Sequence, residues 1–103
     1  MKIYKHLYTT ETTKGVTGMI IKKLGGKRPL KGYWFLTVSG DCPGLMEIKR
    51  SEDVSGKNFS DEDLAIVGMA SSKEEAMLLS GSILMDIKEK TGSFDVKKFF
   101  GRE

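Results

Sequence analysis

The side chains that most often carry catalysis or bind metals are few in this sequence. The chain has one histidine, His6, and one cysteine, Cys42, so neither a cysteine–histidine pair nor a His/Cys metal cluster is predicted. The acidic stretch 61–63 lacks the Asp-x-Asp-x-Asp-Gly spacing of a calcium loop, and residues 25–27, GGK, lack the GxxxxGK[ST] pattern of a phosphate loop. We therefore expect no catalytic residue, no cofactor and no metal. A small enzyme without a recognisable motif stays open, because 14 Asp and Glu offer many carboxylate pairs.

The stretch 66–76, IVGMASSKEEA, has the pattern of a strand that passes into a helix. Such a corner can bind phosphate at the helix N-terminus, or it can simply begin the helix. Ser72 and Glu75 are three residues apart, as in a capping box, where the serine accepts from the third amide of the helix. Glu74 and Glu75 would also face an incoming phosphate. The pattern therefore favours an ordinary helix start.

A long helix is predicted over residues 73–91. Lys88 and Lys90 fall in its last turn, where the helix dipole favours cations, and Gly92 supplies a left-handed stop. One stripe at helical spacing is apolar and should face the core. Its members are Ala76, Leu79, Ile83, Leu84 and Ile87.

A second apolar stripe lies on the opposite side of this helix. Leu78 and Met85 project there, with Gly81 between them. A helix with one buried face does not need these side chains, so we expect something to cover them. The cover is either the C-terminal segment with its phenylalanines, Phe94, Phe99 and Phe100, or a protein partner, including a second copy of the chain.

The rest of the chain predicts strands followed by that helix. Strands are expected over 2–10, 33–39, 45–51 and 64–70, with 19–24 either a further strand or a short helix. The run 64–70, LAIVGMA, is continuously apolar, which predicts a central strand. We expect a single α+β domain over residues 1–103, with an antiparallel sheet of about four to five strands. The helix should pack on one face of that sheet, and a short helical turn should follow near Asp95.

The hairpin over 33–51 has alternating faces with two alternative roles. Tyr33 and Phe35 share a face that Lys49 adjoins, and aromatic rings beside cations are what single-stranded nucleic acid stacks on. Alternatively, these two rings pack against Tyr4 and Tyr8 of the first strand.

Positive charge is concentrated in the first part of the chain. Residues 1–40 carry eight lysines and arginines against Glu11 alone, whereas the remainder carries nine cations and 13 acids. This asymmetry favours either an anionic partner or a set of solvated lysines. The residues that would contact nucleic acid are Lys22, Lys23, Lys27, Arg28, Lys31 and Lys49. They could hold a phosphate backbone but would not distinguish sequences.

The location of the protein is predicted from what the sequence lacks. No apolar run approaches the roughly 20 residues that span a bilayer, so no membrane contact is expected. The N-terminus has no signal-peptide pattern, and a lone cysteine suits a reducing compartment. We expect a cytoplasmic protein.

Three resemblances to known proteins are present. Residues 68–76, GMASSKEEA, resemble the last strand-to-helix junction of double-stranded-RNA-binding domains, in which Lys73 would be the first phosphate contact; Glu74 and Met77 stand where that family has lysines. Pro43-Gly44 and residues 74–76, EEA, resemble antitoxins of the HicB kind. The chain as a whole, with IYKHLY near its start and KTGSFDV near its end, is similar to small bacterial proteins of uncharacterised function.

These patterns together predict a binding domain rather than an enzyme. The predicted protein interface is Leu78, Gly81 and Met85, and the predicted partner is another protein or a second copy. Nucleic acid bound by the basic residues is the alternative.

Overall fold

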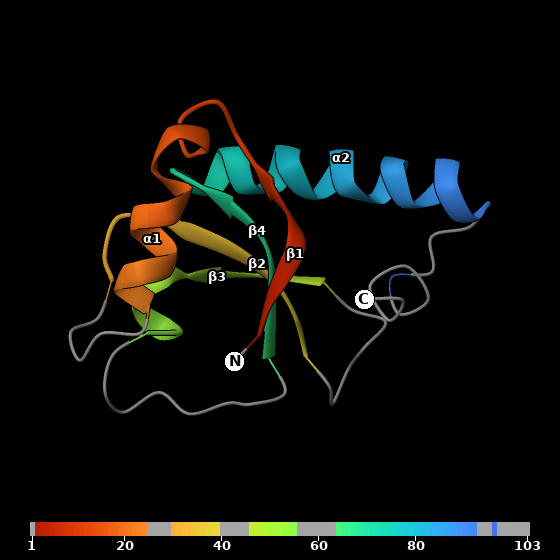
Figure 1. The fold of residues 1–103 in the computed structure, drawn as a ribbon. Helices are drawn as coiled ribbons and strands as arrows, with labels where there is room; N and C mark the ends of the chain where they lie inside the picture. Colours follow the sequence, from red (N-terminus) through yellow and green to blue (C-terminus); the bar gives the residue numbers. More distant parts are fainter. Residues whose placement is uncertain (1, 25–29, 40–45, 56–63, 93–95, 97–103) are drawn as a thin grey trace.

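The computed structural model describes residues 2–24, 30–39, 46–55, 64–92 and 96. It shows an α+β fold in which a twisted four-stranded sheet lies between two helices (Figure 1). The elements are β1 (Lys2–Thr9), the 3₁₀ turn η1 (Lys14–Val16), α1 (Thr17–Leu24), β2 (Trp34–Ser39), β3 (Met46–Arg50), the 3₁₀ turn η2 (Ser51–Asp53), β4 (Leu64–Ala70) and α2 (Lys73–Thr91).

The strands are arranged in the order β1-β4-β2-β3. β2 pairs antiparallel with both β3 and β4, whereas β1 pairs parallel with β4, so the sheet is mostly but not wholly antiparallel. β4 is central as its continuous apolar run predicted: Ile66, Val67 and Met69 are fully buried. Between Ile3 and Tyr8 the pairing of β1 with β4 shifts register, which marks an irregularity in this edge strand.

The long helix has the predicted bounds. The Ser72 side chain accepts a hydrogen bond of 3.1 Å from the Glu75 amide, and Gly92 ends the helix with φ = 78°, a conformation that glycine adopts without strain. The predicted core stripe is confirmed: Ala76, Ile83 and Ile87 are fully buried, and Leu79 and Leu84 are partly buried against the same cluster.

Residues 19–24 form a helix, so the strand interpretation of that run is wrong. Ile20 and Leu24, four residues apart, point to the sheet and are buried. The Thr17 hydroxyl donates to the Thr13 carbonyl at 3.0 Å in the turn before them. A run of six residues is too short for its period to separate the two structures, and here the burial of Ile20 and Leu24 at helical spacing decides it.

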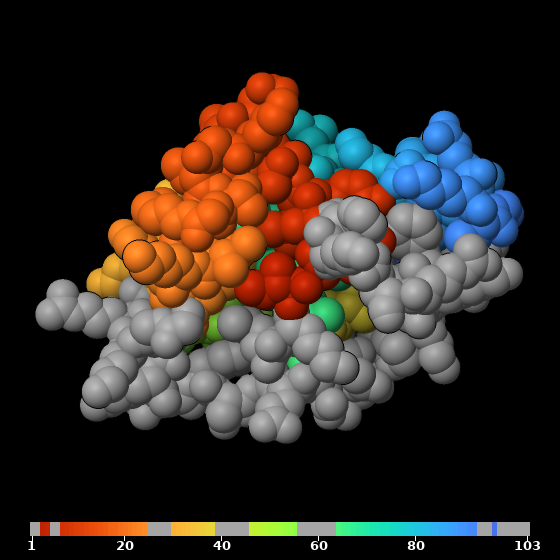
Figure 2. All heavy atoms as spheres, in the orientation of Figure 1, coloured from red at the N-terminus to blue at the C-terminus, as the bar shows by residue number. Residues whose placement is uncertain are grey.

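Both faces of the sheet are covered, one by each helix. The cluster on the α1 side consists of Ile20, Leu24, Leu30, Phe35, Val54, Leu64, Ile66 and Met69. The cluster on the α2 side consists of Leu36, Val38, Val67, Ile83, Ile87 and Val96. Figure 2 shows α1 in orange beside the red β1, with the blue end of α2 at the upper right of the same view.

The presence of α1 on this face of the sheet overturns both interpretations of Tyr33 and Phe35. Phe35 is fully buried beneath α1 and cannot stack on a base, and Tyr33 is partly buried against the same cluster. Tyr4 and Tyr8 lie on the other side of the sheet, with the α2 cluster, so Tyr33 and Phe35 do not pack on them either.

Two buried serines attach the start of β2 to η2. The Ser51 hydroxyl donates to the Leu30 carbonyl at 2.7 Å and accepts from the Tyr33 amide at 3.2 Å. The Ser55 hydroxyl accepts from the Leu30 amide at 2.7 Å and donates to the Ser51 carbonyl at 2.6 Å. This network, called here the serine latch, satisfies backbone groups that strand pairing leaves free.

The turn expected near Asp95 falls outside the described residues, as do Phe94, Phe99 and Phe100. Val96 is described: it is helical and packs in the cluster beneath α2.

Candidate interaction surface

The side of α2 that points away from the sheet exposes a row of large apolar side chains. Leu78 is 76% exposed, and Met77 and Met85 are each 57% exposed. Gly81, also exposed, lies between them. We call Met77, Leu78, Gly81 and Met85 the outer face of α2. The core stripe of the same helix packs against the sheet, with Ala76, Ile83 and Ile87 fully buried, so the outer face contributes nothing to the core.

The predicted interface residues Leu78, Gly81 and Met85 therefore lie together on one surface. The prediction that the chain covers Leu78 itself is not confirmed, given its exposure. Met77 is not among the predicted interface residues, although its spacing of four residues from Gly81 and eight from Met85 places it on the same side.

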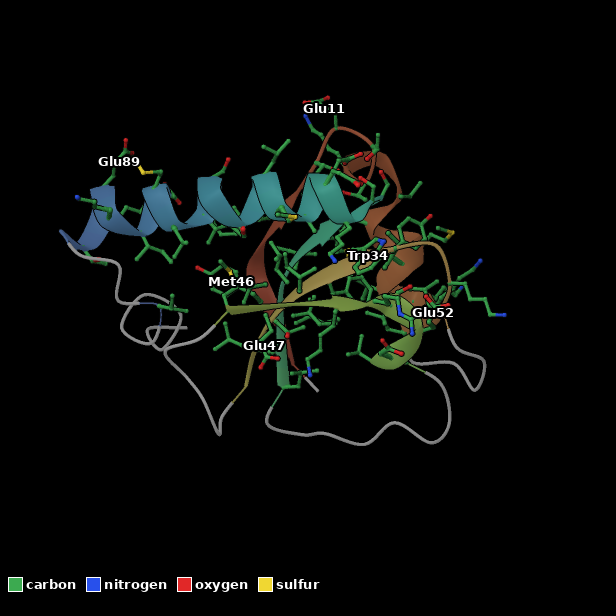
Figure 3. The ribbon with its side chains drawn as sticks, turned by 180° about the vertical axis from the view of Figure 1, so that it is seen from behind. Glu11, Trp34, Met46, Glu47, Glu52 and Glu89 are labelled. Atoms are coloured by element: carbon green, nitrogen blue, oxygen red, sulfur yellow. The ribbon has the colours of Figure 1, made fainter. Side chains whose placement is uncertain are left out.

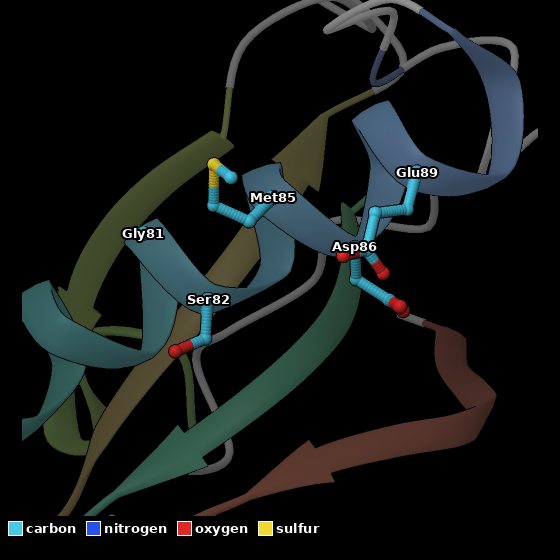
Figure 4. A pocket seen from close by; sticks show the side chains of 5 residues that line it. All are labelled: Gly81, Ser82, Met85, Asp86 and Glu89. Atoms are coloured by element: carbon cyan, nitrogen blue, oxygen red, sulfur yellow. The ribbon is translucent and has the colours of Figure 1, made fainter.

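A hollow open to solvent adjoins the outer face. Its volume is about 540 Å³, and Gly81, Ser82, Met85, Asp86 and Glu89 line it (Figure 4). A Cβ atom placed on Gly81 would have no other atom within 4 Å, which shows that the missing side chain leaves open space. Another molecule can therefore approach the helix backbone closely at this point.

Asp86 connects this hollow to β1. Its carboxylate accepts a short hydrogen bond from the Tyr8 hydroxyl and lies 3.3 Å from the Lys90 ammonium. The Tyr8 bond is the main reason why the pKa of Asp86 is lowered, and burial is the main reason why the pKa of Tyr8 is raised. Tyr8 in turn stacks on Tyr4 with ring centroids 6.4 Å apart. These contacts fix how α2 lies on β1, so a role in holding the fold together accounts for Asp86.

Opposite charges lie at the two ends of the outer face. Glu74 is exposed in the first turn of α2, and Lys88 is exposed in the last. Figure 3 shows the length of the helix between these ends, with Glu11 in the turn beside its start and Glu89 near its end.

The corner at the start of α2 is closed by a carboxylate. Glu75 accepts hydrogen bonds from the Ser71 hydroxyl at 2.7 Å and the Thr12 hydroxyl at 2.8 Å, and these donors lower its pKa. In a reciprocal capping box this carboxylate would bind the Ser72 amide; here it links α2 to the turn after β1 instead. A phosphate would meet this negative charge at close range, so the corner serves the helix start, as its sequence predicted.

The predicted nucleic-acid residues are only partly gathered. Lys22 and Lys23 of α1 are exposed, as is Lys31, and Lys49 is half-buried on β3. Lys49 pairs with Phe35, so it lies on the α1 side of the sheet. Lys27 and Arg28 lie outside the described residues, as do Cys42 and the acidic stretch 61–63. The backbone of His6 is placed within β1.

Within the described part of the chain, no three His, Cys, Asp or Glu side chains are grouped so that they could hold a metal ion. No helix in that same part is long and apolar enough to cross a membrane.

Comparison of the chain with protein-family models, with curated proteins and with solved structures finds no match. The resemblances at residues 68–76 and at 74–76 therefore stay predictions.

Proposed function

We propose that this protein is a small, non-catalytic binding domain of the cytoplasm that binds a protein partner, including a second copy of itself, through the outer face of α2. The observation that carries the proposal is the exposure of Leu78, 76% in a helix whose opposite side fully buries Ile83 and Ile87. Exposed apolar side chains in a contiguous row favour a protein contact, since their burial removes apolar surface from water. A flat row beside an open hollow suits a protein side chain better than a small molecule, which prefers an enclosed pocket.

Photo-crosslinking in cells that produce the protein tests this proposal. A photoreactive amino acid at Ser82, which is exposed at the edge of the hollow, should give one discrete protein adduct. The same photoreactive amino acid placed at Lys23 on α1 is the matched control and should not give that adduct. A Leu78→Ser change should remove the adduct while the chain stays folded, because Leu78 makes little contact with the core. An adduct that survives this change, or no adduct at Ser82, would contradict the proposal.

Nucleic acid is the competing partner, and the burial of Phe35 weakens the case for it. The aromatic platform expected at Tyr33 and Phe35 does not exist, because Phe35 is fully buried. Within the described residues, the exposed Lys22, Lys23 and Lys31 and the half-buried Lys49 remain as contacts.

We expect no binding of mixed-sequence RNA or DNA at 50 mM salt, measured by fluorescence anisotropy. Six working phosphate contacts would instead bind at 50 mM salt and lose on the order of 10³-fold in affinity by 200 mM. Binding with that salt dependence, abolished by the double change Lys22→Glu and Lys23→Glu, would favour the nucleic-acid function over the proposed one.

A further inference from the structure

We infer that the partner of the outer face is a second copy of this chain, docked with the two α2 helices antiparallel and a two-fold axis close to Gly81. This inference rests on the proposed function and names the partner of the same surface.

The spacing of the exposed residues is the first argument. Glu74, Leu78, Gly81, Met85 and Lys88 follow one another at intervals of four, three, four and three residues, and all are exposed. A mean interval of about 3.5 residues is the repeat with which two helices keep one seam in contact. Within the described residues, no other helix packs against this seam.

The order of charges along the seam sets the orientation. An antiparallel pair places Glu74 beside the partner's Lys88, and by symmetry Lys88 beside the partner's Glu74. A parallel pair would instead place like charges together at both ends. Gly81 is midway between the two charged residues, so matching the ends places the symmetry axis near it. Antiparallel helices also bring the opposite ends of their dipoles together.

The hollow beside Gly81 supplies the room that such a contact needs. Close to a two-fold axis at Gly81, the nearest large side chains of the second copy are the partner's Leu78 and the partner's Met85. Either can enter the hollow, since nothing lies within 4 Å of the Gly81 Cβ position. Burial of these side chains would remove the exposed apolar row of both copies from water together.

The expected dimer is weak. α2 has 19 residues, so the helix pair is about 28 Å long. An interface of one helix per subunit is at the small end of specific contacts, which indicates a dissociation constant of micromolar or higher. The monomer and dimer should therefore both be seen by sedimentation when the concentration is varied up to about 1 mM.

A charge exchange tests the orientation directly. In Glu74→Lys alone, the dimer would bring lysine against lysine at both ends; in Lys88→Glu alone, it would bring glutamate against glutamate. Each variant should self-associate about tenfold or more weakly than the unmodified chain. An equimolar mixture of the two variants should recover the loss, because each end of the mixed dimer then pairs a lysine with a glutamate. The double variant in one chain should recover it too.

Several results would overturn the inference. These are no dimer of the unmodified chain up to about 1 mM, single variants that associate as well as the unmodified chain, or a mixture that stays as weak as its components. Circular dichroism of each variant shows whether α2 is intact, and a helix defect in a single variant would not be repaired by mixing. If the Ser82 adduct has the mass of the chain plus a different protein, the proposed function holds and the dimer is wrong.

Discussion

Replacing Phe35 with alanine is expected to lower the free energy of unfolding by about 3–5 kcal/mol, the largest effect of any change considered for this chain. Phe35 is fully buried in the cluster between the sheet and α1, so its removal loses the transfer energy of the ring and leaves a cavity. A domain of this size is stabilised by about 5–15 kcal/mol, so this single change removes a large part of the total stability.

Urea denaturation followed by the fluorescence of Trp34, the one tryptophan of the chain, measures this loss. Phe35→Leu is the matched control and should cost less, because it retains most of the side-chain volume. The result also separates two roles of the hairpin. If Phe35→Ala kept its stability and lost affinity for RNA instead, the ring would be a base-stacking residue and its place in the core would be wrong.

The second large effect is expected at the serine latch. Ser51→Ala should destabilise the fold by about 1–3 kcal/mol, because the Leu30 carbonyl and the Tyr33 amide each lose the hydroxyl that pairs with them. Ser51 itself is fully buried, so water cannot easily replace it.

Ser55→Ala provides a second test of the same network, because its hydroxyl binds the Leu30 amide. The two changes share Leu30, so the double variant should cost less than the two single costs added together. Ser80→Ala is the control: its hydroxyl binds the Met77 carbonyl within the helix at an exposed place, and the change should stay within about 0.5 kcal/mol. Equal losses of stability in Ser51→Ala and Ser80→Ala would contradict the stabilising role of the serine latch.

The sequence predicted those elements whose signals are local and strong. α2 was predicted with its bounds because Ser72, Gly92 and the apolar stripe give independent signals. β4 was predicted to be central because its apolar run is continuous. The predicted interface residues Leu78, Gly81 and Met85 lie together because helical spacing alone decides which side of a helix a residue occupies.

What the sequence did not predict depends on contacts between distant residues. The apolar run over residues 19–24 does not separate helix from strand, because it is only six residues long. The coverage of the second sheet face follows from that ambiguity: without α1, the neighbours expected for Phe35 are Tyr4 and Tyr8, which lie on the other face of the sheet. The parallel pairing of β1 with β4 has no signature in either strand, since strand direction depends on how the intervening chain is connected. Likewise, the bond between Tyr8 and Asp86 joins residues from opposite ends of the chain.

The position of β1 beside β4 has a consequence for the newly made chain. Ile3 pairs with Ile66, so β1 has no partner strand until β4, which begins more than 50 residues after β1 ends, has also been made. At a synthesis rate of about 5–20 residues per second, this wait is on the order of several seconds. Ile3 and Leu7, which pack in the core of the finished fold, face water or a chaperone during that time. β1 is thus made before its partner strand and takes its place in the sheet late in folding.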